Sequence, residues 1–334
     1  MIEQYLVTVG ITTYNSNLVY LSNAIDSATN QTYRNIEIII SDDGSNNIDE
    51  IENLIKNKKD KRITLLKNKQ NSGVSNSLNN IINFSKGDYF SWCPDDDYMH
   101  LSKIELQVRS LESEPQSISI CNHFQVLDIF NIKRIIKHAF YLKFVNIFLY
   151  LVTLDRINGG SLLIPASMLK DKKFNLSLKH VQDYDMWIKL FYRTKYVYLN
   201  RALFYSRQHS KQASKNDNKS AQEEISEFYL DFFKNNMHNL IYYFGKKTYL
   251  LIIMSFEFRD IKKVVNYFME KNKYQKYILN FYNKKNFFLI LIYLFKIFGR
   301  ILFIMREIKN FFLYKFFFKL LKLNIFDLNK NEKF

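Results

Sequence analysis

Three adjacent carboxylates, Asp95, Asp96 and Asp97, follow the apolar segment 89–92 and are the residues of this chain best suited to do chemistry. Like charges at the end of a buried strand repel one another and resist desolvation, so a positive group normally lies among them. A hard divalent cation with oxygen ligands is the natural candidate. The triplet therefore predicts a metal site.

A second acidic cluster has the same design. Asp42, Asp43, Gly44 and Ser45 come at the end of the apolar run that starts at Ile36. In open α/β sheets, ligands bind beyond the carboxyl ends of the strands. Two acidic clusters at strand ends therefore predict a site for a metal and a nucleotide at the carboxyl edge of a sheet.

The elements that must hold these clusters alternate between short apolar runs and amphipathic segments. Uninterrupted apolar strands separated by helices indicate a sheet that is covered on both faces, so we predict an α/β fold of βαβ units. The predicted strands are 6–12, 36–41, 63–66 and 89–92, and the predicted helices are 18–29, 48–56, 74–84 and 102–111.

The second half of this region is less regular. Residues 123–155 are aromatic and basic, and we interpret them as a helical insertion or a lid. Gly159 and Gly160 open a strand that ends at Pro165, and their lack of side chains would let a substrate approach the floor of the site. Further predictions are a helix at 182–192, two strands at 196–199 and 204–208, a polar loop at 210–220, and a domain boundary near 215–225.

Five blocks in this order resemble the inverting family 2 glycosyltransferases, whose fold is the nucleotide-diphospho-sugar transferase type called GT-A. The resemblance covers roughly residues 5–214. The blocks are Thr12-Thr13-Tyr14-Asn15, Asp42-Asp43-Gly44-Ser45, Asn71-Ser72-Gly73 leading to Asn79, the triplet Asp95-Asp96-Asp97, and Val181-Gln182-Asp183-Tyr184-Asp185-Met186-Trp187. The later Arg207-Gln208-His209 resembles the family's Arg-x-His element.

This resemblance implies a Rossmann-like GT-A domain at residues 1–220 and a helical C-terminal appendage at 221–334. It also implies Mn²⁺ or Mg²⁺, held by Asp96, Asp97 and His209. The family pattern would place an Asp at Pro94, so the metal pair is either Asp95 with Asp97 or Asp96 with Asp97, and we favour the second. The implied contacts to the nucleotide-sugar are Thr13, Tyr14, Asn15, Asp42, Asp43, Ser45, Asn71, Gly73, Asp95, Asp96 and Arg207.

The resemblance also implies a catalytic base. Asp183 matches the Asp of the family's Glu-Asp motif, and Gln182 stands where the family has Glu. One base, one metal and back-side attack give a single displacement with inversion at the anomeric carbon. A second departure is Leu78, which stands where many members carry a basic residue just before the Asn at position 79.

The charge of the chain is unevenly distributed. Its 334 residues carry a formal net charge of +16, and residues 271–334 alone hold 14 Lys and Arg against 3 Asp and Glu, or +11. The remainder is close to balanced, which argues against a nucleic-acid-binding surface spread over the whole protein.

The basic tail contains the apolar run 287–305, which has the length of a membrane span. Lys296 and Arg300 in its middle would be costly in a bilayer. Basic stripes opposite Phe, Leu and Ile faces are typical of helices that lie in the membrane interface. We predict peripheral attachment to the anionic inner face of the cell membrane; an ordinary helical subdomain and a true span are less favoured.

Two further features predict a cytoplasmic location. Cys93 and Cys121 lie in apolar strand-like segments, as expected of buried free thiols in a reducing compartment. The N-terminus runs directly into a strand pattern without the basic and apolar regions of a signal peptide, so we expect none.

Together these features predict a metal-dependent inverting glycosyltransferase that uses a nucleotide-sugar, with a UDP-sugar favoured. Its acceptor would be a glycan or a lipid-linked oligosaccharide in lipopolysaccharide or capsule synthesis. A nucleotidyltransferase would need a Gly-rich basic loop after the first strand, and the segment 12–15 has none. The sequence also fits, less well, a catalytically degenerate transferase or a basic module that binds membranes or nucleic acid. The donor sugar, the acceptor and the oligomeric state are left open.

Overall fold

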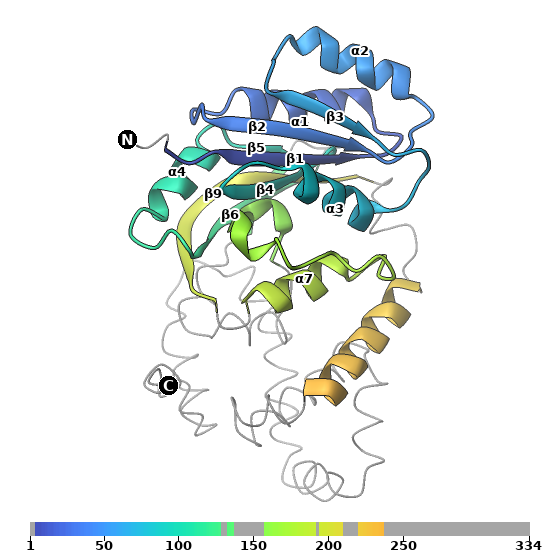
Figure 1. Cartoon of the computed structure of the whole chain (residues 1–334), viewed down its shortest axis with the longest axis vertical. Helices are drawn as coiled ribbons and strands as arrows, with labels where there is room; N and C mark the ends of the chain where they lie inside the picture. The colour runs from blue at the N-terminus through green and yellow to red at the C-terminus, as the bar shows by residue number, and fades with distance from the viewer. Residues whose placement is uncertain (1–3, 128–131, 137–156, 192–193, 210–219, 237–334) are drawn as a thin grey trace, which may run out of the picture. The chain divides into compact units, whose positions relative to one another are not determined.

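A computed structural model describes residues 4–127, 132–136, 157–191, 194–209 and 220–236 (Figure 1). The chain divides into two compact units, Met1–Glu224 and Ile225–Phe334. The roles predicted for the two domains stay predictions. Within the described ranges, no helix combines the length and the apolar character needed to cross a membrane. The predicted interfacial run 287–305 lies outside these ranges.

The first unit alternates strands and helices along its N-terminal half, as the sequence predicted. Its strands are β1 Val7–Thr13, β2 Ile36–Asp42, β3 Ile63–Lys67, β4 Tyr89–Pro94, β5 Tyr98–Met99, β6 Ile118–Leu127, β7 Ile132–Ile136, β8 Leu162–Pro165 and β9 Tyr196–Gln208. Its helices are α1 Leu18–Thr29, α2 Ile48–Lys58, α3 Val74–Phe84, α4 Lys103–Ser110 and α7 Gln182–Phe191, with short 3₁₀ turns η3 Gly159–Ser161 and η4 Ala166–Met168. A further helix covers residues 220–236.

These strands form one curled, mixed sheet in the order β3-β2-β1-β4-β8-β6-β9-β5, with β7 paired to β6. The pairs β2–β3, β1–β2 and β1–β4 are parallel, as predicted for βαβ units. Strand β8 is antiparallel to both β4 and β6 and so joins the parallel half of the sheet to the rest. Strand β9 then runs parallel to β6 and brings the chain back toward β5.

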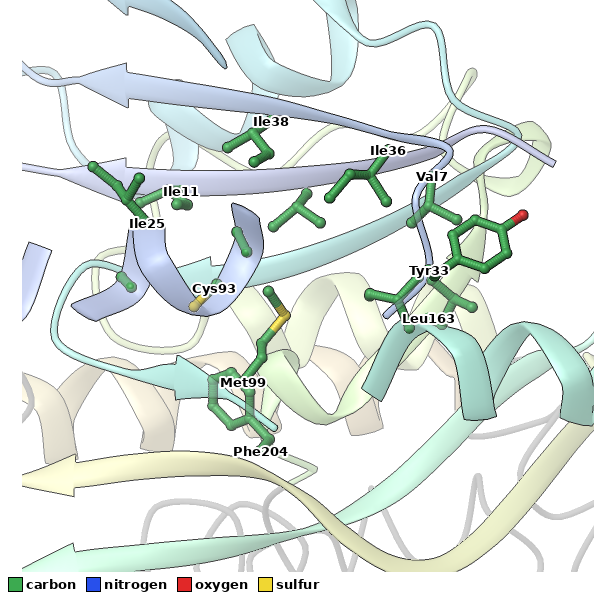
Figure 2. Packing of buried hydrophobic residues seen from close by; sticks show 14 of the residues in the cluster. Val7, Ile11, Ile25, Tyr33, Ile36, Ile38, Cys93, Met99, Leu163 and Phe204 are labelled. Carbon is green, nitrogen blue, oxygen red and sulfur yellow. The ribbon is translucent and has the colours of Figure 1, made fainter. Parts of the chain in front are cut away.

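Alternation along β1 places α1 and α3 on opposite faces of the sheet. Val9 and Ile11 belong to the core cluster that includes Leu21 and Ala24 of α1. Gly10, between them, points to the other face, where an added Cβ would lie 2.9 Å from Ile81 of α3. Figure 2 shows the α1 side of this packing, with Met99 beside Phe204 at one end of the cluster and Ile11, Ile25 and Ile38 toward the other.

Cys93 and Cys121 are buried free thiols, as predicted. Burial raises the pKa of both thiols, that of Cys121 to about 11. Lys103 of α4 is also fully buried, and its Nζ atom donates to Ser91 Oγ at 2.8 Å and to the Leu162 carbonyl at 3.4 Å. This ammonium group links β4 to β8 inside the protein.

The predicted substrate opening at Gly159 and Gly160 is wrong. A Cβ on Gly159 would lie 2.5 Å from the ring of Trp92 and 3.0 Å from that of Trp187, and a Cβ on Gly160 would overlap the ring of Phe204. Aromatic rings fill the space that we expected to admit a substrate. The glycines are needed because these rings pack directly on the backbone.

Two other predictions need correction. The helical insertion expected at 123–155 is wrong for its described part, because residues up to Leu127 continue β6 and residues 132–136 form β7. The remainder, 137–156, lies outside the described residues. The two short strands expected at 196–199 and 204–208 are one strand, β9, whose pairing with β6 shifts register around Asn122. A β-bulge lets a long strand bend without ending.

Candidate active site

The carboxyl ends of three parallel strands meet at one edge of the sheet. In register, Thr13 of β1 lies beside Asp42 of β2, and Thr12 lies beside Pro94 of β4. The amide of Asp43 also donates to the Thr13 carbonyl at 2.9 Å. The fold therefore brings the two acidic clusters to the same edge, as the sequence predicted.

Among the described residues, one carboxylate oxygen of Asp42 has hydrogen-bond donors and the other has none. Its Oδ2 atom accepts hydrogen bonds from the amides of Gly44 at 3.1 Å and Ser45 at 3.0 Å. Gly44 has a φ of +78°, and a side chain there would approach the Gln70 backbone to 2.8 Å, so only glycine fits this turn. The Oδ1 atom of Asp42 is buried and has no hydrogen-bond partner among the described residues. Such an oxygen favours a ligand that donates an N–H or O–H group.

Asp43 uses its carboxylate to hold the loop before α3. Its Oδ1 atom accepts from Asn68 Nδ2 at 2.8 Å and from the Ser72 amide at 3.0 Å, and its Oδ2 atom accepts from the Gly73 amide at 2.7 Å. Asn71 Oδ1 also accepts from the Gly73 amide, at 3.2 Å. Asp43 therefore shapes the loop 68–73 at the end of β3.

Asn15 joins the loop after β1 to the loop after β2. Its amide donates to Ser45 Oγ at 2.8 Å, and its Oδ1 atom accepts from the Asn46 amide at 2.8 Å. Asn15 has a φ of +47°, in the left-handed region that Asn tolerates better than most residues. Tyr14 beside it is 45% exposed. The two loops therefore form one continuous wall of the site, with the Tyr14 ring at its surface.

Asp95 faces the loop after β1. Burial, followed by the charge of Asp96, raises the pKa of Asp95 to about 6. Polar contacts with Ser16 and with the backbone at Tyr14 partly offset this rise. The first carboxylate of the triplet thus lies against the wall made by residues 13–16.

The other two carboxylates face residues at the end of β9. Asp96 Oδ2 lies 3.1 Å from His209 Nε2. Asp97 is buried, and its Oδ1 atom accepts from the Arg207 amide at 2.8 Å. Burial, followed by the charge of Asp96, raises the pKa of Asp97 well above its ordinary value. Strand β9 and the residue after it therefore supply a partner to each of these two carboxylates.

The guanidinium of Arg207 is held between two aromatic rings. Its Cζ atom lies 4.6 Å from the centroid of the Tyr20 ring and 4.8 Å from that of Tyr98. An arginine between two rings gains cation–π attraction on both faces. Its Nη1 atom donates to the Asp96 carbonyl at 3.1 Å. Arg207 thus holds the triplet loop against β9, and its predicted contact with the donor stays a prediction.

Asp96 and His209 are a donor set that fits a divalent cation. Both side chains are partly exposed, at 24% and 19%. The described residues contain no group of three His, Cys, Asp or Glu side chains placed to hold a metal. Mg²⁺-type sites commonly use one or two protein ligands and complete their coordination with substrate phosphates and water. The pair fits that arrangement, and the metal role predicted for Asp97 stays a prediction.

Asp183 lies in the first turn of α7, where its Oδ1 atom accepts from the Tyr184 amide at 2.9 Å. Residues four apart share a helix face, so Asp183 lies on the face that carries Trp187. The Trp187 ring and the Trp92 ring of β4 flank Gly159. This packing places the Trp187 face of α7 near β4, the strand that precedes the acidic triplet.

Comparisons with known proteins agree with this geometry. Residues 8–168 match the profile of Glycosyl transferase family 2. The Escherichia coli UDP-Glc:alpha-D-GlcNAc-diphosphoundecaprenol beta-1,3-glucosyltransferase WfaP is 31% identical over 191 residues, which are 55% of this chain and 70% of that protein. The chain belongs to glycosyl transferase family 2. An uncharacterized glycosyltransferase of Rickettsia felis is 37% identical over 215 residues. The match covers 63% of this chain but only 35% of that relative, so this chain spans about a third of its length.

Two solved structures share the fold of this member of glycosyl transferase family 2. S. aureus TarS 1-349 in complex with UDP-GlcNAc has a TM-score of 0.56 at 15% identity, over 68% of this chain and 66% of that one. The mannosyltransferase PcManGT from Pyrobaculum calidifontis, in complex with GDP-Man and Mn2+, has a TM-score of 0.52 at 14% identity, over 70% and 64%. The predicted GT-A fold is confirmed.

Most predicted site residues of this family 2 glycosyltransferase come together at one sheet edge. Asn79, which closes the third sequence block and was assigned no contact, makes two side-chain hydrogen bonds with the Phe174 backbone, at 3.0 and 2.8 Å. Leu78, which replaces the family's basic residue, is fully buried. Sequence reasoning missed Tyr20 and Tyr98. Nothing in the local pattern marks their pairing with Arg207, which depends on the return of β9 to the site.

Proposed function

We propose that this family 2 glycosyltransferase transfers a sugar from a UDP-sugar to a hydroxyl of a lipid-linked acceptor, with inversion and with a divalent metal. The observation that carries the proposal is the meeting of β1, β2, β4 and the end of β9 at one edge of the sheet. This edge combines an acceptor for a nucleoside with a carboxylate–imidazole pair for a metal. Helix α7, whose first turn is acidic, packs through Trp187 beside Gly159, which the Trp92 ring of β4 also flanks.

The nucleoside would bind against the loops after β1 and β2. The buried Oδ1 atom of Asp42 has no donor among the described residues, so it would accept from the base or the ribose. Tyr14, in the loop after β1, is 45% exposed and offers an aromatic face for the base. Asp43 and Asn15 contribute indirectly, because their hydrogen bonds hold both loops in place.

The diphosphate would lie near Asp96 and His209, which would hold Mn²⁺ or Mg²⁺. Such an ion would offset the charge that develops on the leaving diphosphate. Asp97 and Arg207 position Asp96 through the hydrogen bonds of the Arg207 backbone and guanidinium. The orientation of the metal-binding carboxylate therefore depends on β9 as well as on the triplet.

Asp183 would act as the general base. The acceptor hydroxyl loses its proton to the Asp183 carboxylate while its oxygen forms the new bond to the anomeric carbon. The bond between that carbon and the diphosphate oxygen breaks at the same time, and the nucleoside diphosphate leaves with the electron pair. Attack opposite the leaving group inverts the anomeric configuration.

The relatives support the choice of substrates. The name of WfaP states a UDP-Glc donor and an alpha-D-GlcNAc-diphosphoundecaprenol acceptor. We extend the proposal to surface polysaccharide synthesis, including lipopolysaccharide or capsule. The basic segment 271–334, with its charge of +11, would attach the protein to an anionic membrane surface on the cytoplasmic side.

Calorimetric titration of UDP into the whole chain, with Mn²⁺ or with EDTA, tests the donor and metal parts of the proposal. Binding that requires Mn²⁺ and that weakens in His209→Ala supports them. Mass spectrometry of a diphosphoundecaprenol-linked sugar incubated with UDP-sugars then tests transfer. UDP binding without any transfer would favour the degenerate transferase, and no binding of UDP under either condition would overturn the choice of donor.

A further inference from the structure

The carboxylate of Glu224 accepts hydrogen bonds from the backbone amides of three consecutive residues. Its Oε1 atom lies 3.0 Å from the amide of Lys179, 2.7 Å from that of His180 and 3.0 Å from that of Val181. Its Oε2 atom also lies 3.0 Å from the Lys179 amide. Consecutive amides that converge on one anion form a backbone nest, and such charge-assisted bonds are stronger than neutral ones.

These three residues lead directly into the helix that carries the proposed base. The amide of Asp185 donates to the Val181 carbonyl at 3.0 Å, so Val181 is the residue that caps α7. Asp183 follows two residues later, in the first turn. The start of a helix has amides without partners inside the helix, so its direction depends on groups supplied from elsewhere. Glu224 supplies such a group 43 residues away from Val181.

We propose that Glu224 is a positioning residue for Asp183. By fixing the backbone of residues 179–181, its carboxylate sets where α7 begins and therefore where the Asp183 carboxylate points. Proton transfer requires the base to lie within hydrogen-bond reach of the acceptor hydroxyl, and a displacement of about 1 Å can slow catalysis by roughly 100-fold. This inference rests on the proposed function of Asp183.

The test compares Glu224→Ala and Glu224→Gln with a neighbouring control in the whole chain. Glu223 is exposed and suits the control, as Glu223→Ala. We expect Glu224→Ala to lower kcat by roughly 10- to 100-fold while the KM for the donor changes less than about twofold. Glu224→Gln keeps a neutral hydrogen-bond acceptor, so its kcat should lie between that of Glu224→Ala and that of the wild type. Hydrogen–deuterium exchange should rise at residues 179–181 in Glu224→Ala and stay unchanged in Glu223→Ala.

A double variant separates positioning from a general loss of structure. If Glu224 acts through Asp183, then adding Glu224→Ala to Asp183→Asn should lower kcat by less than about twofold. If Glu224→Ala lowers kcat as much in the Asp183→Asn background as in the wild type, the inference is overturned. An unchanged kcat in the single variant Glu224→Ala would also overturn it. A wild-type chain that transfers no sugar would instead overturn the proposed function, whatever the exchange at residues 179–181 shows.

Discussion

His209 Nε2 lies 3.1 Å from Asp96 Oδ2, although 113 residues separate them in the sequence. The contact exists because β9 runs parallel to β6 and ends beside β5, which directly follows the acidic triplet. Two residue types that bind divalent cations thereby meet next to the carboxyl ends of β1 and β4. This pair is the basis of the metal dependence that we expect of the protein.

Removing either member of the pair should weaken UDP binding only when metal is present. We expect His209→Ala and Asp96→Asn to lower the affinity for UDP in Mn²⁺ by at least about 10-fold, because each removes one protein ligand. In EDTA, where we expect little or no UDP binding, the variants should match the wild type. Calorimetry measures both, and His100→Ala is the matched control because His100 is exposed and its ring bonds Ser102 rather than a carboxylate. Equal UDP affinity in all four proteins, with Mn²⁺ present, would contradict a metal at this pair.

Asp183→Asn should abolish most transfer and leave donor binding intact. Removing a general base typically slows the chemical step by about 100- to 10,000-fold, and Asn keeps the size of the side chain. Asp185→Asn is the control, since Asp185 in the same turn is paired with Lys189 at 2.5 Å. Initial rates with a UDP-sugar measure transfer, and calorimetry with UDP measures donor binding. Wild-type turnover in Asp183→Asn would exclude it as the base.

Arg207→Lys should destabilise the protein even though the charge is kept. A lysine cannot be stacked between Tyr20 and Tyr98 in the same way, and it loses the planar donor that reaches the Asp96 carbonyl. We expect the free energy of unfolding to fall by about 1–2 kcal/mol. Chemical denaturation measures this, and Lys195→Arg, on an exposed lysine, should be neutral. No loss of stability in Arg207→Lys would show that the two rings contribute little.

The buried amine of Lys103 should make stability depend on pH. Burial lowers the pKa of Lys103 to about 8, whereas the unfolded amine keeps a pKa near 10.5. Between these values the unfolded chain holds the extra proton, so the free energy of unfolding should rise as the pH rises from 8 toward 10.5. A shift of this size corresponds to about 3 kcal/mol over the whole window.

Denaturation of the wild type and of Lys103→Met between pH 7 and 10 tests this linkage. The free energy of unfolding of the wild type should rise relative to that of Lys103→Met as the pH rises. The reason is that the wild type stops burying a charged amine, whereas Met carries no charge at any pH. The comparison also removes the contribution of Tyr89, whose pKa burial raises to about 12. A difference that stays constant with pH would mean that the Lys103 amine does not titrate in this range.

Gly160→Ala should be strongly destabilising. The new Cβ would overlap the ring of Phe204, which is fully buried. Overpacking of this kind costs about 1–3 kcal/mol or more. Thermal unfolding measures the loss, and Gly73→Ala is an informative comparison because a Cβ there meets nothing within 4 Å and the strain comes only from its φ of +88°. Equally small losses of thermal stability in Gly160→Ala and Gly73→Ala would contradict the packing of Phe204 on Gly160.

The N-terminal half of the fold was predictable from local pattern. Helices α1 and α3 have the bounds expected from their apolar spacing, and β1 to β4 follow the apolar runs. Each of these elements has one dominant local signal, and parallel strands must place their carboxyl ends at the same edge. The meeting of Asp42 and Asp95 at the candidate site followed from that rule.

The region after β5 was not predictable in the same way. The polar second half of β6 and the basic strand β7 have sequences that fit several structures, and only pairing with β9 and with each other selects strands. The glycines at 159 and 160 looked like an opening, but the rings that fill it come from β4, α7 and β9. Contacts between segments so far apart leave no local signal.

The sequence by itself determined the fold class, the strand-end acidic clusters and, through resemblance, the family. These features depend on residue type and short spacing, which a single chain displays directly. Only the tertiary structure decided the division of labour among the acidic residues: Asp96 beside His209, Asp97 on the Arg207 amide, and Asp43 on the loop before α3. The physical reason is that a carboxylate's role depends on its burial and on the donors around it, and here those donors come from distant segments.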